Sequence, residues 1–160
     1  MRQLPGALGG GLRVLKILIA EDDLMIADMV KILLVDAGYE VCGIARTVTE
    51  AVALIRRHKP DLAVIDVRLA DDDLGTDIAV QLGGLHRPGV LYATANVSAV
   101  VLTAAGGHAC LSKPYRSSDL LRGLEIVAEI VATGTASPPF PRGFQVLPAA
   151  TIKPSEPPHG

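Results

Sequence analysis

Residues 62–66 read Leu-Ala-Val-Ile-Asp, a short apolar run that ends in a carboxylate. Two other strand-like runs also end in charge: residues 15–20 precede Glu21-Asp22-Asp23, and residues 109–112 precede Lys113-Pro114. Short apolar runs that alternate with helical patterns predict a parallel α/β sheet, whose ligand site lies beyond the carboxyl ends of its strands. We therefore expect the acids and the lysine at these strand ends to share one pocket.

The composition predicts one domain with an aliphatic core, because 160 residues are 49% hydrophobic but only 3% aromatic. A net charge of -2 gives no basic face of the kind that binds nucleic acid. No run reaches the roughly 18 apolar residues that a membrane span needs. These features predict a cytoplasmic protein without a membrane segment.

The two ends of the chain differ from its middle. Residues 1–13 contain three consecutive glycines and lack the continuous apolar core of a secretory signal, so we expect a flexible leader. After Gly134 the periodic apolar pattern disappears, and seven of the eleven prolines fall between Pro138 and Pro158. The sequence therefore predicts a domain over 14–133 and a proline-rich, disordered tail over 134–160.

Hydrophobic periodicity predicts five βα units between these ends. Together they favour a doubly wound, flavodoxin-like (βα)5 fold with five parallel strands in the order 2-1-3-4-5. The expected strands are residues 15–20, 39–45, 62–66, 90–94 and 109–112. The expected helices are 24–37, a second from the capping pair Thr47 and Glu50 to about 57, 76–82, 97–105, and 118 or 119 to 132.

The two cysteines, Cys42 and Cys110, fall on the second and fifth expected strands. These strands form opposite edges of a sheet in this order, which places the thiols too far apart for a disulfide. We expect both to be buried and reduced, and Cys110 to be a packed small residue rather than a redox sensor.

The strand ends supply the groups for metal-assisted phosphoryl transfer. Mg²⁺ prefers hard oxygen ligands, and Glu21, Asp22 and Asp66 supply them. Attack by Asp66 on a phosphoryl donor would give an acyl phosphate. Lys113 can hold a phosphoryl oxygen or the Asp66 carboxylate, and the Thr94 hydroxyl can donate a hydrogen bond.

The ordered motifs resemble the receiver domain of two-component response regulators over about residues 14–133. The motifs are Ile17-Leu18-Ile19-Ala20-Glu21-Asp22-Asp23, Val64-Ile65-Asp66, Ala93-Thr94-Ala95 and Ser112-Lys113-Pro114. By position, the resemblance implies that Glu21 and Asp22 bind Mg²⁺ and that Asp66 is the phosphoacceptor. It also implies that Asp66 and the backbone carbonyl of Arg68, two residues later, bind the metal.

The same resemblance assigns Thr94 as the switch hydroxyl and Lys113 as the phosphate-contacting lysine. It implies a single-domain response regulator that receives phosphate from a sensor histidine kinase or a histidine phosphotransferase and contacts an unidentified downstream protein. Such a protein is not an enzyme beyond its own phosphorylation and dephosphorylation. The face of helix 4, strand 5 and helix 5 would repack on phosphorylation and could support a homodimer or a heterologous complex.

The chain departs from the family pattern at Cys110, where an aromatic residue often follows the switch. Tyr92, two residues before Thr94, or Tyr115, after the lysine, is expected to fill the vacated space. The interval from Thr94 to Lys113 is short for the family, which predicts a truncated or mobile helix 4.

Several alternatives stay open from sequence. The chain could be a phosphate shuttle or sink without a dedicated output, or a phosphorylation-independent adaptor. A haloacid-dehalogenase-like phosphatase also forms an aspartyl phosphate, but that family has a second aspartate where this chain has Arg68. A purely structural salt-bridge cluster is disfavoured, because three acids packed against one lysine repel one another without a cation. The run Asp71-Asp72-Asp73 is expected to be solvated and outside the site.

Overall fold

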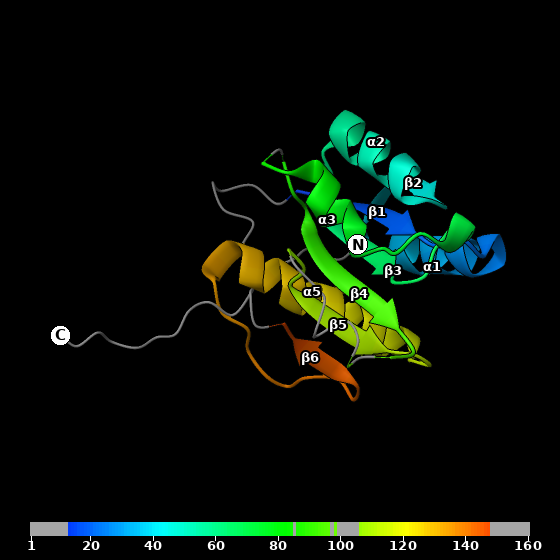
Figure 1. The fold of residues 1–160 in the computed structure, drawn as a ribbon. Coiled ribbons are helices and arrows are strands. Elements are labelled where there is room, and N and C mark those ends of the chain that lie inside the picture. Colours follow the sequence, from blue (N-terminus) through cyan, green and yellow to red (C-terminus); the bar gives the residue numbers. More distant parts are fainter. Residues whose placement is uncertain (1–12, 85, 97, 99–105, 148–160) are drawn as a thin grey trace.

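The computed structural model describes residues 13–84, 86–96, 98 and 106–147 (Figure 1). Its sheet has six strands in the order β2-β1-β3-β4-β5-β6. The strands β1 to β5 run parallel, and β6 runs antiparallel to β5. The strands are β1 (Lys16–Ala20), β2 (Glu40–Ala45), β3 (Leu62–Asp66), β4 (Gly89–Thr94), β5 (Ala109–Ser112) and β6 (Phe144–Val146).

Helices cover both faces of this sheet, with α1 and α5 on one side and α2 and α3 on the other (Figure 1). A short 3-10 turn, Ala70–Asp72, precedes α3. The helix expected over 97–105 lies outside the described residues. The described helices are α1 (Leu24–Asp36), α2 (Val48–His58), α3 (Asp77–Leu82) and α5 (Ser117–Thr133).

Side-chain hydrogen bonds cap the starts of α1 and α2. Thr47 caps α2 by accepting from the Glu50 N–H at 3.1 Å, and Glu50 reaches back to the Arg46 N–H at 2.7 Å. This is close to the capping box that the sequence predicts. At α1 the Asp23 carboxylate accepts from the N–H groups of Met25 and Ile26. Asp23 is thereby used as a helix cap and is not part of the acidic cluster described below.

The core consists of two aliphatic layers, one on each face of the sheet. Both faces of β3 and β4 are covered, so these strands are continuous apolar runs rather than alternating ones. The layer under α1 and α5 includes Ile19, Val64, Leu91 and Leu124, among others. The layer under α2 and α3 includes Leu18, Ile55, Ile65, Ile78 and Tyr92. A sheet held from both sides fixes the positions of its strand ends.

The predicted fold class is confirmed, but the predicted number of strands is wrong. Residues 144–146 add a sixth strand to the edge of β5, in a segment expected to be disordered. Phe144 and Val146, two residues apart on this strand, both pack on Ile126 and Ile130 of α5. A strand of three residues is too short to show an alternating apolar pattern in the sequence. Its partner, β5, is distant in sequence, so no local signal indicates the pairing. Residues 148–160 of the expected tail (134–160) and residues 1–12 of the expected leader (1–13) lie outside the described residues.

The cysteines lie on strands β2 and β5, which are separated by three other strands. Both are free thiols; Cys110 is buried and Cys42 is only half-buried. Burial raises the pKa of both thiols. A raised pKa lowers the thiolate fraction at neutral pH, which agrees with a packing role for Cys110. The expectation that β5 forms an edge is wrong, since β6 covers it.

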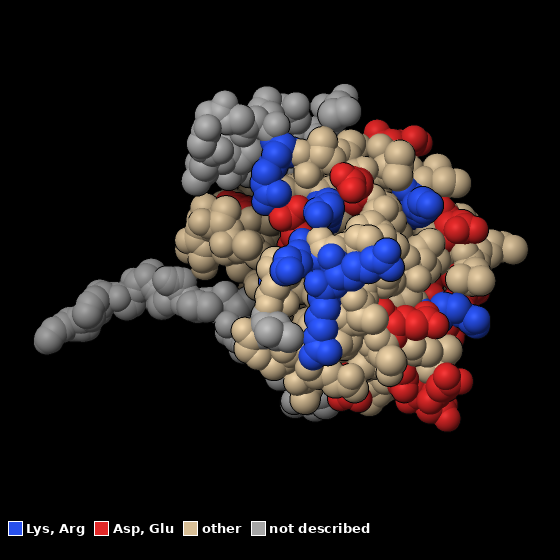
Figure 2. All heavy atoms as spheres, turned by 90° about the horizontal axis from the view of Figure 1, so that it is seen from above, with Lys and Arg blue, Asp and Glu red and all other residues tan. Residues whose placement is uncertain are grey.

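The surface charge is uneven although the net charge is only -2. Figure 2 shows lysine and arginine side chains gathered in the middle of the face seen from above, with most acidic side chains toward one side. Within the part of the chain that the structure describes, no helix combines the length and apolar character needed to cross a bilayer.

At Gly75 the loop after β3 packs closely against the backbone of β3. Its N–H donates to the Val67 carbonyl at 2.7 Å, and an added Cβ would lie 2.2 Å from the Asp66 carbonyl oxygen. We expect Gly75→Ala to destabilise the protein by about 1–3 kcal/mol in urea unfolding, because backbone must shift. Gly84→Ala is the matched control, since nothing lies within 4 Å of its added Cβ. Equal unfolding midpoints for the two variants would contradict this account.

Candidate functional site

The candidate site lies at the carboxyl end of the sheet, where four strand ends converge. Glu21 follows β1, Asp66 ends β3, Thr94 ends β4 and Lys113 follows β5. The parallel register aligns these ends, with Ala20 beside Ile65, Asp66 beside Ala93, and Thr94 beside Ser112. Side chains 92 residues apart in sequence, from Glu21 to Lys113, are thus neighbours.

Three carboxylates and one ammonium group form the centre of the site. Glu21, Asp22 and Asp66 each offer a carboxylate oxygen, and these oxygens lie within 4.8 Å of one another. Lys113 Nζ lies 2.9 Å from Asp66 Oδ2 and 3.7 Å from Glu21 Oε1. The lysine therefore bridges two of the three acids.

Backbone N–H groups fix the orientation of the two innermost carboxylates. Asp66 Oδ1 accepts from the Arg68 N–H at 3.1 Å, while its other oxygen accepts from Lys113. Glu21 Oε2 accepts from the Asp23 N–H at 3.1 Å. Glu21 itself is held by its own N–H, which donates to the Ala45 carbonyl at 2.9 Å. Each carboxylate is thus aimed by main chain as well as by charge.

The pKa values of Glu21 and Lys113 are shifted because the site is partly buried and charged groups lie close together in it. Burial, together with the nearby Asp66 charge, raises the pKa of Glu21 to about 7, despite the Asp23 N–H and Lys113. Burial by itself lowers the pKa of Lys113, but the hydrogen bond and charge of Asp66 outweigh it, so this pKa is raised. The lysine stays cationic, and Glu21 is partly protonated near neutral pH unless more positive charge is added.

This donor set fits Mg²⁺. The ligands are all hard oxygens, they come from three carboxylates at one sheet edge, and a cation would relieve the repulsion that raises the Glu21 pKa. The family resemblance adds the Arg68 backbone carbonyl to the ligands. The N–H of the same residue donates to Asp66 Oδ1. The role of the carbonyl as a ligand stays a prediction.

The loop acids Asp71, Asp72 and Asp73 lie outside this cluster. Asp73 Oδ2 accepts from the Val48 N–H at 2.8 Å at the start of α2, a structural role that the sequence did not indicate. Asp71 and Asp72 have positive φ angles of 62° and 60° within the 3-10 turn. Since the partner of Asp73 is 25 residues away, no local pattern could have identified this cap.

Thr94 is tied to the lysine through the backbone. The Lys113 N–H donates to the Thr94 carbonyl at 2.8 Å. The Thr94 hydroxyl oxygen accepts from the Asn96 N–H at 3.0 Å, and a hydroxyl group can donate at the same time. Thr94 is 6% exposed, so a move of this hydroxyl requires neighbouring atoms to move too.

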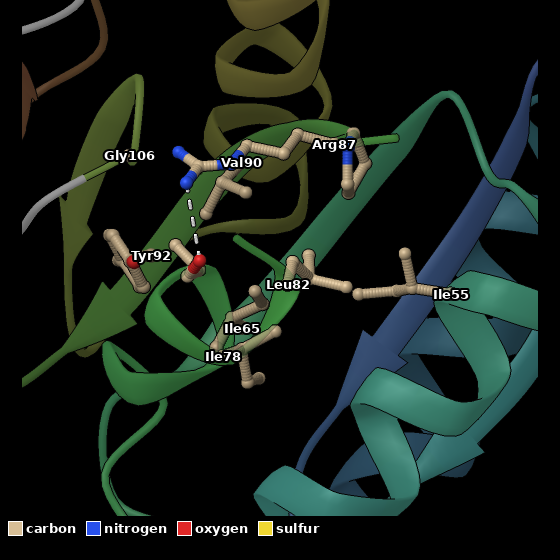
Figure 3. Close-up of a pocket in the computed structure, with 10 residues that line it drawn as sticks. Ile55, Ile65, Ile78, Leu82, Arg87, Val90, Tyr92 and Gly106 are labelled. Carbon is tan, nitrogen blue, oxygen red and sulfur yellow. Dashed lines mark hydrogen bonds between the residues drawn. The ribbon is translucent and has the colours of Figure 1, made fainter. Parts of the chain in front are cut away.

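Of the two tyrosines expected to fill the space beside Cys110, Tyr92 is in the right layer. Tyr92 pairs with Cys110 across β4 and β5, and both belong to the layer under α2 and α3. Tyr115 packs in the opposite layer. Figure 3 shows Tyr92 beside a small cavity with room for about one water, and its wall includes Ile65 and Leu82. Burial raises the Tyr92 pKa to about 12.

Comparison with known proteins decides the family. A model of the response regulator receiver domain matches residues 17–125. The chain belongs to the response regulator receiver domain family. Its fold agrees: the structure of PhyR from Brucella abortus superposes with a TM-score of 0.59 at 26% identity, covering 82% of this chain and 48% of that one. The receiver domain of Erythrobacter litoralis PhyR superposes with a TM-score of 0.62 at 23% identity, covering 79% of this chain and 95% of that one. At this identity the similarity supports the fold alone.

Two relatives by sequence are larger regulators. The receiver domain is 34% identical over 114 residues to the transcriptional regulatory protein PdtaR of Mycobacterium tuberculosis, covering 69% of this chain and 55% of that protein. It is 38% identical over 81 residues to the phyllosphere-induced regulator PhyR of Methylorubrum extorquens, covering 50% and 30%. The chain thus spans about half, or less, of the length of these curated relatives. Two-component signalling is the functional class that the family supports.

The raised Glu21 pKa predicts how metal-free stability depends on pH. Folded Glu21 binds its proton more tightly than the unfolded chain does, so its contribution to stability is full below about pH 4.5 and is lost as pH rises through about 7. We expect Glu21→Gln to be more stable than wild type at about pH 8 and to show a weaker dependence on pH. Urea unfolding in EDTA at about pH 5 and 8 measures both effects.

Glu40→Gln is the control for this experiment, because Glu40 is an exposed residue at the start of β2. Addition of Mg²⁺ should stabilise wild type at about pH 8 more than Glu21→Gln, since the variant has lost a carboxylate ligand. If the free energy of unfolding depends on pH in the same way in wild type and Glu21→Gln, the pKa of Glu21 is not raised in the folded protein.

Proposed function

We propose that the protein is a single-domain response regulator that accepts a phosphoryl group on Asp66 from a histidine kinase or a histidine phosphotransferase and signals through protein contacts. The observation that carries the proposal is the position of the Asp66 carboxylate. It lies between two further acids and the Lys113 ammonium group at the carboxyl edge of the sheet. This is the arrangement that phosphoryl transfer to a carboxylate requires.

In the proposed reaction an Asp66 carboxylate oxygen attacks the phosphorus atom. A new phosphorus–oxygen bond forms, the bond to the donor group breaks, and the donor leaves with its electron pair. Bound Mg²⁺, held by Glu21, Asp22, Asp66 and the Arg68 carbonyl, would neutralise charge on the donor and on the transferred group. Lys113 would exchange its bond to Asp66 Oδ2 for a bond to a phosphoryl oxygen, and it stays charged because its pKa is raised.

The Thr94 hydroxyl would then donate to the phosphoryl group. The Thr94 carbonyl accepts from the Lys113 N–H, so this backbone hydrogen bond links the two residues, and we expect them to shift together. The phosphoryl group carries about -1.5 to -2 charges, but its bond to Asp66 removes the charge of that carboxylate, so the site gains about one negative charge where acids already repel one another. Tyr92, two residues before Thr94 and packed against Cys110, is proposed to follow this movement in place of the usual aromatic residue.

A partner that delivers phosphate to Asp66 needs a docking surface beside the site, and α1 offers one. The helix begins at Leu24, directly after the acidic residues, and buries only Ala27, Val30 and Leu34. Its outer side is apolar: Met25 is 74% exposed, Met29 65% and Ile32 63%. An exposed apolar stripe of this kind marks a protein contact. We propose that the kinase or phosphotransferase docks here.

The first test of the proposed function is the intact mass of the protein after incubation with acetyl phosphate or phosphoramidate. With Mg²⁺, wild type should gain one phosphoryl group, and Asp66→Ala should gain none because the attacking oxygen is gone. Lys113→Ala should be labelled at least about tenfold more slowly, since one charge-assisted contact to the transferred group is lost. Asp28→Ala, on the exposed side of α1, is the control and should be labelled normally.

Without Mg²⁺ the adduct should be absent or strongly reduced. Binding of beryllofluoride, measured in parallel, separates a short-lived adduct from one that never forms. Neither an adduct nor beryllofluoride binding in the presence of Mg²⁺ would overturn the proposal and favour a phosphorylation-independent adaptor.

The proposed docking surface predicts a separation between two kinds of donor. In Met29→Asp, a charge replaces a methionine in the middle of the apolar stripe, so docking should weaken by at least about tenfold. Transfer from any histidine kinase or phosphotransferase that labels wild type should fall accordingly, while labelling by acetyl phosphate should stay unchanged. Val80→Asp, at a similarly exposed position on α3, is the control. Normal protein-to-protein transfer to Met29→Asp would exclude α1 as the docking surface.

A further inference from the structure

The segment after α5, residues 134–147, folds back over the receiver domain, and we call it the C-terminal strap. Arg122 of α5 holds its first part: Nε donates to the Pro139 carbonyl at 3.1 Å and Nη2 to the Ser137 carbonyl at 2.9 Å. Glu129, two turns further along α5, accepts from the Ser137 N–H at 3.2 Å. The strap is therefore bound by a specific set of polar contacts to one side of α5.

The end of the strap covers apolar surface. Phe144 and Val146 of β6 pack on Ile126 and Ile130, which are 0% and 5% exposed as a result. Phe140 stacks on Phe144 with a centroid distance of 5.8 Å. At the same time β6 takes up the edge of β5, from Ala109 to Leu111. Figure 1 shows the strap lying along α5 and ending beside β5.

The strap therefore closes the part of the surface that the sequence suggested for a homodimer. A second protein cannot pair with the edge of β5 or reach Ile126 and Ile130 while the strap is bound. Any partner of this β5–α5 face must displace residues of the same chain first.

Gly143, the strap residue just before β6, is connected to the phosphoacceptor by consecutive contacts. Asp66 Oδ2 accepts from Lys113 Nζ, and the preceding residue, Ser112, donates its N–H to the Gly143 carbonyl at 2.9 Å. Contact is tight at this point, because a Cβ added at Gly143 would lie 3.0 Å from the Ser112 Cβ. A shift of the backbone at Ser112 and Lys113 would therefore change the contact between Ser112 and Gly143 of the strap.

Leu147, the strap residue just after β6, is connected to strand β4 through Gly107. The Leu147 N–H donates to the His108 carbonyl at 3.0 Å. An added Cβ at Gly107 would lie 2.2 Å from the Tyr92 ring and 3.2 Å from the Leu147 side chain, so these groups meet over Gly107. Tyr92 lies on the strand that ends in Thr94. The strap residues on both sides of β6 therefore lie next to the proposed switch: Gly143 contacts Ser112 beside Lys113, and Leu147 meets Tyr92 over Gly107.

We propose that the C-terminal strap is an intramolecular occupant of the β5–α5 face, which phosphorylation of Asp66 loosens. This inference rests on the proposed function. The direction follows from the order of the strands: Asp66 on β3 and the strap lie on opposite sides of β5. A phosphoryl group that draws Lys113 and Thr94 inward pulls Ser112 away from Gly143, and the β5–β6 hydrogen bonds weaken.

The occupied face indicates what kind of partner fits once the strap has left. Phe144 and Val146 are two residues apart and point to the same side of an extended strand that runs antiparallel to β5. The partner is then a protein that supplies an extended segment with apolar residues at alternate positions, which adds to the sheet edge and covers Ile126 and Ile130. The strap competes with that segment by occupying the same contacts.

Hydrogen exchange of the full chain, followed by mass spectrometry, tests this proposal. The sample is compared before and after treatment with acetyl phosphate and Mg²⁺, and the intact mass of the same sample gives the phosphorylated fraction. We expect the amides of Ser112 and Leu147, which donate across the β5–β6 pair, to exchange about tenfold faster in the phosphorylated protein. Amides of β1 serve as an internal reference, and Asp66→Ala should show no change.

Two variants calibrate the measurement without phosphate. Phe144→Ala removes the main apolar contact of the strap, so its strap amides should exchange faster than those of wild type. Val80→Ala changes an exposed residue of α3 and should leave them unchanged. Phe144→Ala thereby shows that the experiment detects a loosened strap.

The outcomes separate the two proposals. An adduct accompanied by faster exchange in the strap supports both. An adduct with unchanged strap exchange, where Phe144→Ala does exchange faster, overturns the strap proposal and leaves phosphorylation of Asp66 standing. No adduct and no response to beryllofluoride overturns the proposed function and the strap proposal with it.

Discussion

Repulsion among the carboxylates of Glu21, Asp22 and Asp66 is the constraint around which the site is organised. Their oxygens lie within 4.8 Å of one another, and one lysine cannot neutralise all three. The cost appears in the Glu21 pKa, which burial and the neighbouring Asp66 raise to about 7. Such a cluster is tolerated because a rigid sheet with helices on both faces holds its strand ends together. A cation or a phosphoryl group changes this balance more than it would at an ordinary surface site.

The contacts of Lys113 extend beyond the site. Its ammonium group binds Asp66, its N–H binds the Thr94 carbonyl, and its neighbour Ser112 binds Gly143 of the strap. One short stretch of β5 and the loop after it thus touches the phosphoacceptor, the switch strand and the sixth strand. The side-chain bond is charge-assisted and the others are backbone hydrogen bonds; in our proposal, a change at Asp66 reaches the β5–β6 edge through these bonded groups.

The strap gives this receiver domain an outer surface that the family resemblance alone does not imply. With β6 in place, the β5–α5 face is an internal contact and the sheet has a new, short edge strand. The exposed apolar stripe of α1 lies on another part of the molecule and has no such cover among the described residues. In our proposals the two surfaces have different tasks: the open one binds a partner that delivers phosphate, and access to the closed one depends on the strap.

The sequence by itself determined the βα order, the strands Leu62–Asp66 and Ala109–Ser112, and the cap of α2, because periodicity and capping are local patterns. It also placed Glu21, Asp22, Asp66 and Lys113 at strand ends, and in a parallel sheet strand ends on one edge must meet. Only the tertiary structure decided that Tyr92 rather than Tyr115 lies beside Cys110, that Asp73 caps α2, and that residues 144–146 form a strand. Each of these depends on a partner distant in sequence, which no local pattern encodes.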